Sequence, residues 1–426
     1  MTIPDSTAAL GNASALAAKD EHASRQIRQA VRRTHRIEQM KSIALIAPLF
    51  LFVAIVFIAP ILLLLTQSVD NRMVGATLVS TTQALADWNG PGLPDQQAYD
   101  ALAHDLKTAP REDVAEIAKR LNYDQSGLRS LIMKTNRKMD DKAPAIPPEL
   151  RQGDKNWNDV ENWFAIKRAL PDYTSFYLLR SIDLKVANDG DIVKRPPSEA
   201  LYQDIIGRTF GISLAVTLLC LVLAYPLAYL IATSSTRVAN ILLIFVLLPF
   251  WTSLLVRTTA WVVVLQSAGV VNSLLSWLGL ISAEHPLMLV HNRTGVLIAM
   301  THILLPFMVL PIYSVMKGIA PSYMRAALSL GAPPWKAFLR VYMPLSLPGV
   351  SAGMLLVFII ALGYYITPAL VGGPHDQMLS YFVEYFANQA TNWGMAAALS
   401  AVLLILVGVL YAVYCRLIGI DKLRMG

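Results

Sequence analysis

A basic loop between two long apolar segments, late in the chain, carries the residues whose types and spacing best suit a function. Ser322 is expected to cap a short helix that runs to about Leu330, and Gly331 suits the left-handed conformation that ends a helix. Pro333-Pro334 would open a second short helix, which Pro344 would stop. A helix–glycine–helix element of this kind predicts a rigid projection that a partner can recognise.

Apolar residues follow the second of these helices at helical spacing. Trp335, Phe338, Leu339 and Tyr342 stand at i, i+3, i+4 and i+7 and would form one stripe. On a loop outside the membrane such a stripe can fill a groove on a partner protein. It can equally pack against the chain's own helices, and spacing alone leaves both alternatives open.

No grouping of residues predicts catalysis, a cofactor or a metal. The chain has no Gly-x4-Gly-Lys-Ser/Thr loop for nucleotide phosphates, no nucleophile–base–acid grouping and no His/Cys metal cluster. We therefore expect no catalytic, cofactor-binding or metal site. His302 stands alone in an apolar segment, which favours a structural hydrogen bond, and Cys220 and Cys415 in apolar runs predict no disulfide.

Composition places these residues in a membrane, because hydrophobic residues make up 55% of the chain and charged residues only 15%. Crossing a bilayer as a helix takes about 20 apolar residues. Six segments are long enough, namely Ile43–Leu65, Phe210–Ala232, Ala239–Val264, Val296–Met316, Ser351–Val371 and Met395–Leu417. The sequence therefore predicts an all-α membrane protein with six transmembrane helices. The first helix, within residues 42–67, is too long for a cleaved signal peptide and suits a signal anchor.

Lysine and arginine near the membrane ends predict the orientation. A basic group precedes the first helix and places residues 1–41 in the cytoplasm, namely Arg25, Arg28, Arg32, Arg33, Arg36 and Lys41. Six crossings return residues 419–426 to the cytoplasm, in agreement with Arg416, Lys422 and Arg424. The basic loop, which contains no acidic residue, falls on the same side. The net charge of +7 does not indicate nucleic acid, because the basic residues are not clustered on a soluble module.

Residues 68–206 are rich in charges of both signs and are expected to form an extracytoplasmic insert between the first and second helices. Asp95–Thr108 and Pro110–Leu121 have helical spacing, with Pro110 at the first position of its helix. Later residues would form a small core or pack on the membrane domain, namely Trp157, Trp163, Phe164, Tyr173, Phe176, Tyr177, Leu178 and Leu179. The insert is either a platform for an external binding protein or a passive insertion, which surface sites tolerate well.

The basic loop resembles the cytoplasmic loop of ABC importer permeases, whose pattern is Glu-Ala-Ala, three residues, Gly, nine residues, then Ile-x-Leu-Pro. Both intervals are kept here, while Arg325, Val341 and Met343 replace Glu, Ile and Leu. Arginine loses the favourable interaction of a first-turn glutamate with the helix dipole. The resemblance implies contact with a separate ATPase through Arg325, Ala326, Ala327, Gly331, Trp335, Phe338, Leu339 and Pro344.

Three further segments, Leu247–Arg257, Leu304–Pro311 and Tyr365–Leu370, look like those of permeases in spermidine/putrescine-type importers. The resemblance implies a type I permease fold, with a five-helix core over residues 207–418 and a coupling loop over residues 317–347. It also implies import of a polyamine or a related amine or opine across the bacterial cytoplasmic membrane. The implied partners are ABC ATPase subunits, a second and usually different permease, and an extracytoplasmic solute-binding protein.

A path for an ammonium solute needs aromatic faces and carboxylates. The predicted spans contain no aspartate or glutamate, and Asp376 and Glu384 lie just outside them. Besides the importer permease, a second alternative is a secondary transporter. The absence of acids disfavours it, since ion coupling usually needs intramembrane acids. A third alternative is a membrane-anchored receptor or scaffold. The candidate path residues are four rings and the one charge in the interior of a span, namely Trp251, Arg257, Trp261, Tyr364 and Tyr365.

Overall fold

The computed structural model describes residues 40–41, 44–90, 92–138, 155–282 and 284–418. Most of the predicted N-terminal tail, the whole predicted C-terminal tail and residues 139–154 of the insert lie outside the described residues. The described chain is mainly helical, with one two-stranded antiparallel sheet. It divides into two compact units, Met1–Leu64 and Leu65–Gly426.

Within the described residues, six helical stretches are long and apolar enough to cross a membrane, as the sequence predicts. They are Ala44–Thr66, Tyr202–Thr233, Leu254–Trp277, Arg293–Gly318, Pro334–Leu362 and Trp393–Arg416. The first contains the π-helix η1 (Ala54–Ile58) and α2 (Ala59–Thr66), and none of its apolar window is buried. Side chains this apolar and this exposed require lipid as their solvent.

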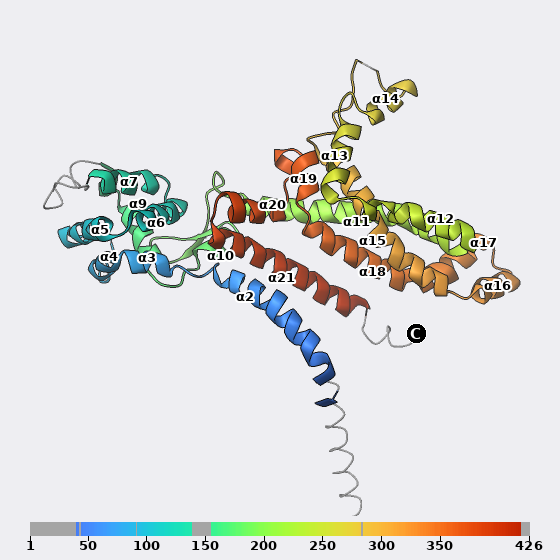
Figure 1. Ribbon diagram of the computed structural model, residues 1–426, viewed down its shortest axis with the longest axis horizontal. Helices are drawn as coiled ribbons and strands as arrows, with labels where there is room; N and C mark the ends of the chain where they lie inside the picture. The colour runs from blue at the N-terminus through green and yellow to red at the C-terminus, as the bar shows by residue number, and fades with distance from the viewer. Residues whose placement is uncertain (1–39, 42–43, 91, 139–154, 283, 419–426) are drawn as a thin grey trace, which may run out of the picture. The chain divides into compact units, whose positions relative to one another are not determined.

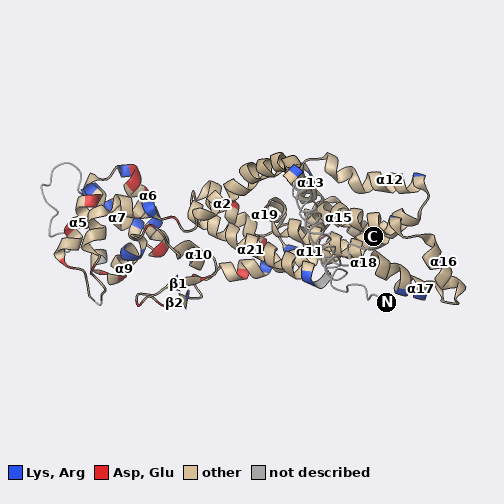
Figure 2. Cartoon of the chain, turned by 90° about the horizontal axis from the view of Figure 1, so that it is seen from below, with Lys and Arg blue, Asp and Glu red and all other residues tan. Residues whose placement is uncertain are grey.

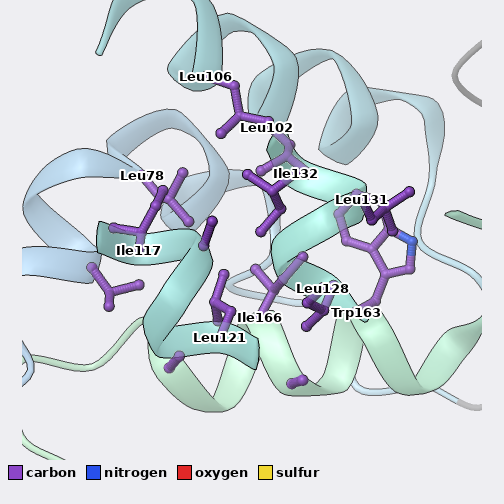
Figure 3. Close-up of a cluster of buried hydrophobic side chains, with 14 of the residues drawn as sticks. Leu78, Leu102, Leu106, Ile117, Leu121, Leu128, Leu131, Ile132, Trp163 and Ile166 are labelled. Carbon is purple, nitrogen blue, oxygen red and sulfur yellow. The ribbon is translucent and has the colours of Figure 1, made fainter. Parts of the chain in front are cut away.

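The insert folds around a hydrophobic core of its own (Figure 3). Leu78, Ile117, Leu121 and Trp163 are fully buried in this core. Its helices are α3 (Arg72–Thr77), α4 (Val79–Ala84), α5 (Gln96–Thr108), α6 (Arg111–Asp124), α7 (Leu128–Lys138), η2 (Lys155–Asn158) and α9 (Val160–Ala169). The two predicted helices are therefore confirmed as α5 and α6, although Pro110 is the N-cap of α6 instead of its first helical residue.

The two ends of this core lie side by side. Asp70 pairs with Tyr173 in an isolated antiparallel bridge, and the Asn71 N–H donates to the Asp172 carbonyl at 2.9 Å. The chain therefore leaves and re-enters at neighbouring points, and residues 71–172 form a closed excursion. The segments that follow are α10 (Phe176–Arg180), β1 (Leu184–Val186) and β2 (Ile192–Lys194), with Leu184 opposite Lys194.

Most of the expected aromatic residues of the insert divide between both purposes, whereas Tyr173, which is 72% exposed, belongs to neither cluster. Trp157 and Trp163 lie in the core of the insert. Phe176 and Tyr177, on α10, pack instead against a second cluster that includes Met395 on α21 (Trp393–Ile418). Charged residues are frequent in the insert and sparse along the membrane helices (Figure 2).

Three helices pack against one another at the centre of the membrane part, namely α11 (Tyr202–Thr233), α15 (Arg293–Gly318) and α18 (Met343–Leu362) (Figure 1). Gly349 and Gly353 bring α18 close to α15. A Cβ at Gly349 would lie 2.9 Å from the Pro311 carbonyl oxygen, and one at Gly353 would lie 2.9 Å from Met308 Sδ. Small residues at this spacing let helix backbones approach closely inside a membrane.

The predicted third span, Ala239–Val264, is not one helix. The helix α12 (Thr236–Leu247) and the 3-10 turn η3 (Leu248–Trp251) end before α13 (Leu254–Leu265) begins. Pro249, inside the turn, cannot continue an α-helical hydrogen-bond ladder. Ser253 then caps the new helix, since its Oγ accepts a hydrogen bond from the Val256 N–H at 3.2 Å.

The predicted fifth span, Ser351–Val371, also has wrong bounds. Its helix begins in the basic loop and ends at Leu362, and Gly363–Tyr365 separate it from α19 (Ile366–Val371). The remaining elements are α14 (Val270–Trp277), η5 (Pro374–Asp376), α20 (Leu379–Glu384) and η6 (Tyr385–Gln389).

Candidate functional site

The basic loop starts with α16 (Pro321–Ser329). Pro321 occupies the start of this helix and Ala320 is its N-cap, so the prediction that Ser322 caps the helix is wrong. Proline fits there because the first N–H groups of a helix have no intrahelical partner. The helix thus begins two residues earlier than the serine suggests.

Gly331 ends α16 in the predicted left-handed conformation, with φ of +85°. The Gly331 N–H donates to the Leu328 carbonyl at 3.0 Å, and the Ala332 N–H donates to the Ala327 carbonyl at 3.2 Å. These two bonds form a Schellman motif, which satisfies carbonyls that the helix end would otherwise leave unpaired. The loop therefore turns through a defined geometry.

The second short helix does not stop at Pro344. The helix α17 (Pro334–Ala337) passes into the π-helix η4 (Phe338–Tyr342) and then directly into α18. The wide π turn ends where α18 begins, and Pro344 falls in the first turn of α18. The loop is thus joined to a membrane helix without a flexible break.

The predicted apolar stripe divides between two surroundings. Trp335 is 61% exposed and Leu339 is 49% exposed. Tyr342 is buried and Phe338 is partly buried, and both contact tyrosine rings on α11. The alternative of packing on the chain's own helices is thus realised by Phe338 and Tyr342 only, while Trp335 and Leu339 remain exposed.

Other residues of the loop add to its exposed surface. Leu330, beside Gly331, is 88% exposed, and Tyr323 is also exposed, although the sequence pattern singled out neither. Arg325 and Ala326 are exposed, Ala327 is partly buried and Pro344 is exposed. The loop thus offers apolar side chains among basic ones, without an acidic residue.

In the membrane part, three of the predicted path residues lie near one another. Trp261 Nε1 donates to His302 Nδ1 at 3.1 Å, and the two rings meet edge-on. This bond agrees with the structural role expected of His302. Arg257 stands one turn before Trp261 on α13 and lies near His302 and Tyr364.

Two donor nitrogens of Arg257, Nε and Nη1, are buried without a hydrogen-bond partner within the described residues. A membrane arginine can be explained by a side chain that reaches the membrane surface or by a hydrogen bond to a backbone carbonyl. Neither is seen for these two nitrogens. Trp251, on η3, and Tyr365 have no side-chain hydrogen bond or ring contact to this group in the described part of the chain. Unused donors on an intramembrane cation make Arg257 a functional candidate.

The two carboxylates nearest the spans are already engaged. Asp376 Oδ1 lies 3.2 Å from Arg293 Nε, and its Oδ2 accepts the Gly373 N–H at 3.2 Å. Glu384 accepts a hydrogen bond from Asn388 Nδ2 at 3.4 Å.

A buried threonine pair, which the sequence pattern did not reveal, joins α13 to α19. The hydroxyls of Thr258 and Thr367 lie 3.1 Å apart, and both residues are fully buried. The pair fixes the two elements that follow the breaks in the third and fifth predicted spans. Threonines are common in membrane helices, so their spacing in sequence carried no signal.

The insert contacts the membrane part through α6 and α10. Lys119 Nζ donates to Thr391 Oγ1 at 2.5 Å, and the Tyr177 ring fills the space where a side chain at Gly394 would start. A hollow of about 810 Å³ lies beside these contacts, lined by residues of α3 and α6 and by residues 391–394. Arg120 stacks on the Phe176 ring beside it, 4.0 Å from the ring centre, and burial lowers the pKa of this guanidinium.

Comparison with known proteins assigns this architecture. Residues 224–418 match the family described as binding-protein-dependent transport system inner membrane component. The chain is 34% identical over 218 residues to the spermidine/putrescine transport system permease protein PotB of Escherichia coli (strain K12), covering 51% of this chain and 78% of that protein. It is 35% identical over 234 residues to the inner membrane ABC transporter permease protein YdcU of the same organism, covering 52% and 73%.

Among solved structures, the chain aligns with part of a bacterial alginate ABC transporter crystallised with an alginate pentasaccharide-bound periplasmic protein. The TM-score is 0.41 and the identity 18%, over 50% of this chain and 77% of that chain.

The family match and the identity to PotB show that the helical membrane part is that of a transport permease. The chain belongs to the family of binding-protein-dependent transport system inner membrane components, the permease subunits of ABC importers. It is a multi-pass protein of the inner membrane and not an enzyme, since a partner ATPase hydrolyses the ATP. A partner permease and a periplasmic binding protein complete such an importer. This membership excludes the secondary-transporter and scaffold readings.

Proposed function

We propose that the chain forms half of the translocation pathway of an ATP-driven importer for a polyamine of the spermidine/putrescine type. The observation that carries this proposal is the 34% identity over 218 residues to the permease protein PotB. Related amines and opines form the wider solute class. The rings of Trp261 and Tyr364, near Arg257, support a path in this region of the membrane part.

Uptake into proteoliposomes tests the solute. The chain is reconstituted with its ATPase, partner permease and binding protein, with ATP on the side of the ATPase. We expect ATP-dependent accumulation of labelled putrescine or spermidine, and none of a neutral sugar of similar mass. Accumulation of an opine alone would leave the importer assignment intact and reject the polyamine.

We also propose that the basic loop, residues 317–347, is the contact with the ATPase. Its exposed apolar side chains, Leu330, Trp335 and Leu339, support this role because isolated apolar residues on a projecting loop suit a groove in a partner. Arg325, Ala326, Ala327, Gly331 and Pro344 give the loop its shape and charge. The proposal requires this loop and both termini to lie in the cytoplasm, which the excess of lysine and arginine supports.

Thiol labelling tests this orientation. In right-side-out vesicles, Leu330→Cys should be protected from a membrane-impermeant maleimide, whereas Thr391→Cys, in the loop that contacts the insert, should react. Labelling of the first position and protection of the second would reverse the proposed topology. The native Cys220 is buried, and a variant without either native cysteine removes the background.

For the path, we propose Trp251, Arg257, Trp261, Tyr364 and Tyr365 as lining residues. The two unpaired donors of Arg257 and its closeness to Tyr364 support Arg257, Trp261 and Tyr364 as members of this set.

For residues 68–206 we propose a platform that contacts the external binding protein. The separate core of the insert and its hollow beside residues 391–394 support a rigid platform.

A further inference from the structure

Four aromatic rings join the basic loop to a membrane helix. Tyr225 and Tyr229 stand one turn apart on α11, and Phe338 and Tyr342 stand at the two ends of η4. The Tyr229 ring centre lies 5.3 Å from that of Phe338 and 5.2 Å from that of Tyr342, with nearly perpendicular planes. Tyr225 meets Phe338 in the same way, at 6.3 Å. We name these four residues the aromatic clamp.

A hydrogen bond extends the aromatic clamp into α18. Ser346 Oγ donates to the Met343 carbonyl at 2.8 Å, and it lies 3.0 Å from the Tyr225 hydroxyl. Because the proton of the serine is already used, the tyrosine hydroxyl is the donor in the second contact. The start of α18 is thus tied to α11 by polar as well as aromatic contacts.

The π turn of η4 gives this segment two different faces. Phe338 and Tyr342 stack with ring centres 5.8 Å apart and both contact α11. Leu339, next to Phe338, and Trp335, one turn earlier, stay exposed. Single π turns recur at functional positions in helices. Here the turn places Leu339, which is exposed, directly after Phe338, which packs on α11.

Edge-to-face ring pairs fix relative orientation more strictly than aliphatic contacts do. Two tyrosines of α11 meet two rings of η4, so these contacts would resist a movement of η4 that α11 does not follow. The helix α11 packs in turn along α15 and α18. A continuous packed route therefore leads from the exposed loop to the centre of the membrane part.

We propose that the aromatic clamp transmits movement of the basic loop to α11 as one rigid body, and that its rings do not themselves bind the ATPase. This inference rests on the proposed role of the loop as the ATPase contact. Phe338 and Tyr229 are then positioning residues for coupling, whereas Trp335 and Leu339 are contact residues. The proposal changes the role that the family resemblance implied for Phe338.

Adjacent substitutions in the complete importer test this division. Phe338→Ala and its matched neighbour Leu339→Ala are compared for ATPase recovered per permease and for solute imported per ATP hydrolysed. Phe338→Ala should keep ATPase recovery within about twofold and lower import per ATP by about tenfold, inside the usual range of coupling between sites. Leu339→Ala should lower ATPase recovery and leave import per ATP unchanged in the complexes that form.

A second pair on α11 separates ring packing from folding. Tyr229→Phe keeps the ring and should behave as the unmodified protein, whereas Tyr229→Leu should repeat the effect of Phe338→Ala. Normal import per ATP in Tyr229→Leu would overturn the proposal, as would loss of ATPase recovery equal to that of Leu339→Ala. If both Tyr229→Leu and Phe338→Ala fail to assemble in the membrane, the aromatic clamp serves folding, and the proposal that it transmits movement is rejected as well.

The proposed role of the loop fails in a different way. If Trp335→Ala and Leu339→Ala both recover the ATPase normally, the loop is not its contact. Low import per ATP in Tyr229→Leu would still show that the aromatic clamp couples α11 to another part of the importer. The two failures are therefore distinguishable in one set of measurements.

Discussion

At the scale of single residues, Gly331 determines how the basic loop turns. Its φ of +85° is strained for a residue with a side chain, and a Cβ placed there would meet nothing within 4 Å. The cost of Gly331→Val is therefore backbone strain of about 1–3 kcal/mol and not a collision. The loop would relieve this strain by redirecting α17 and Trp335, so we expect lower ATPase recovery and lower uptake.

The matched control is Gly331→Asn, since asparagine adopts the left-handed conformation more readily than other residues with side chains. ATPase pull-down and ATP-driven uptake are measured for both variants at equal expression in membranes. Asparagine should retain most activity where valine loses it. Equal activity in valine and glycine would mean that the turn is not needed for coupling.

Trp335 tests the contact itself. Its side chain is 61% exposed, so Trp335→Ala removes an aromatic anchor without opening the core of the chain. Aromatic anchors at interfaces often contribute about 2 kcal/mol or more, which is a loss of about thirtyfold in affinity for the ATPase. Binding of the detached ATPase to permease-containing nanodiscs measures it, with exposed Met288, outside the loop, changed to alanine as the control. Unchanged affinity would remove Trp335 from the contact.

The sequence could predict those residues whose local geometry depends on their own type. Gly331 is one, because few residues other than glycine end a helix in this way. The prediction from Ser322 was wrong because Pro321 offers a competing start for the helix. Local capping signals do not show which of two neighbouring starts the helix uses. The aromatic clamp could not be foreseen, since Tyr225 and Phe338 are far apart in sequence and meet only through the packing of α11 on η4.

At the scale of elements, the number of membrane stretches follows from composition, but the helix ends do not. Pro226, Pro306 and Pro311 lie inside continuous helices, whereas Pro249 lies in a 3-10 break. A proline therefore breaks or bends a membrane helix according to what its neighbours supply to the freed carbonyl. A hydrophobic run contains no information about those neighbours, and this is why the predicted third and fifth spans are wrong.

The insert is the element that can be removed most cleanly. Asp70 and Tyr173 are paired, so residues 71–172 can be replaced by a short glycine-containing turn without moving either end. Their core is their own, and α10 would remain packed on α21. We expect this variant to insert in the membrane and bind the ATPase normally, but to bind the external binding protein more weakly.

Surface plasmon resonance with immobilised nanodiscs measures the docking, and uptake measures the consequence. The control is a cut inside the core, removing about residues 95–170, which would leave Leu78 and Leu85 without their partners and should express poorly. Uptake at the normal rate after excision of residues 71–172 would favour the alternative of a passive insertion.

At the scale of the whole molecule, a single chain does not enclose a path. Trp251 is 77% exposed and Tyr365 is also exposed, although both are proposed to line the path. Two donor nitrogens of Arg257, Nε and Nη1, have no hydrogen-bond partner within the described residues. These side chains need further protein around them. A second permease of similar fold would supply it by packing against the surface that carries them. The exposure of these candidate path residues therefore predicts pairing with a second permease.

We expect the intact importer to contain this 46.8 kDa chain once, together with a different permease chain and two ATPase subunits. A different partner fits the absence of acids from the spans predicted from the sequence, because the other half could then supply the carboxylates that an ammonium solute needs. Native mass spectrometry of the detergent-solubilised complex measures the composition. Two copies of this chain per complex would reject the mixed pairing, and transport by this chain without any ATPase would reject the assembly altogether.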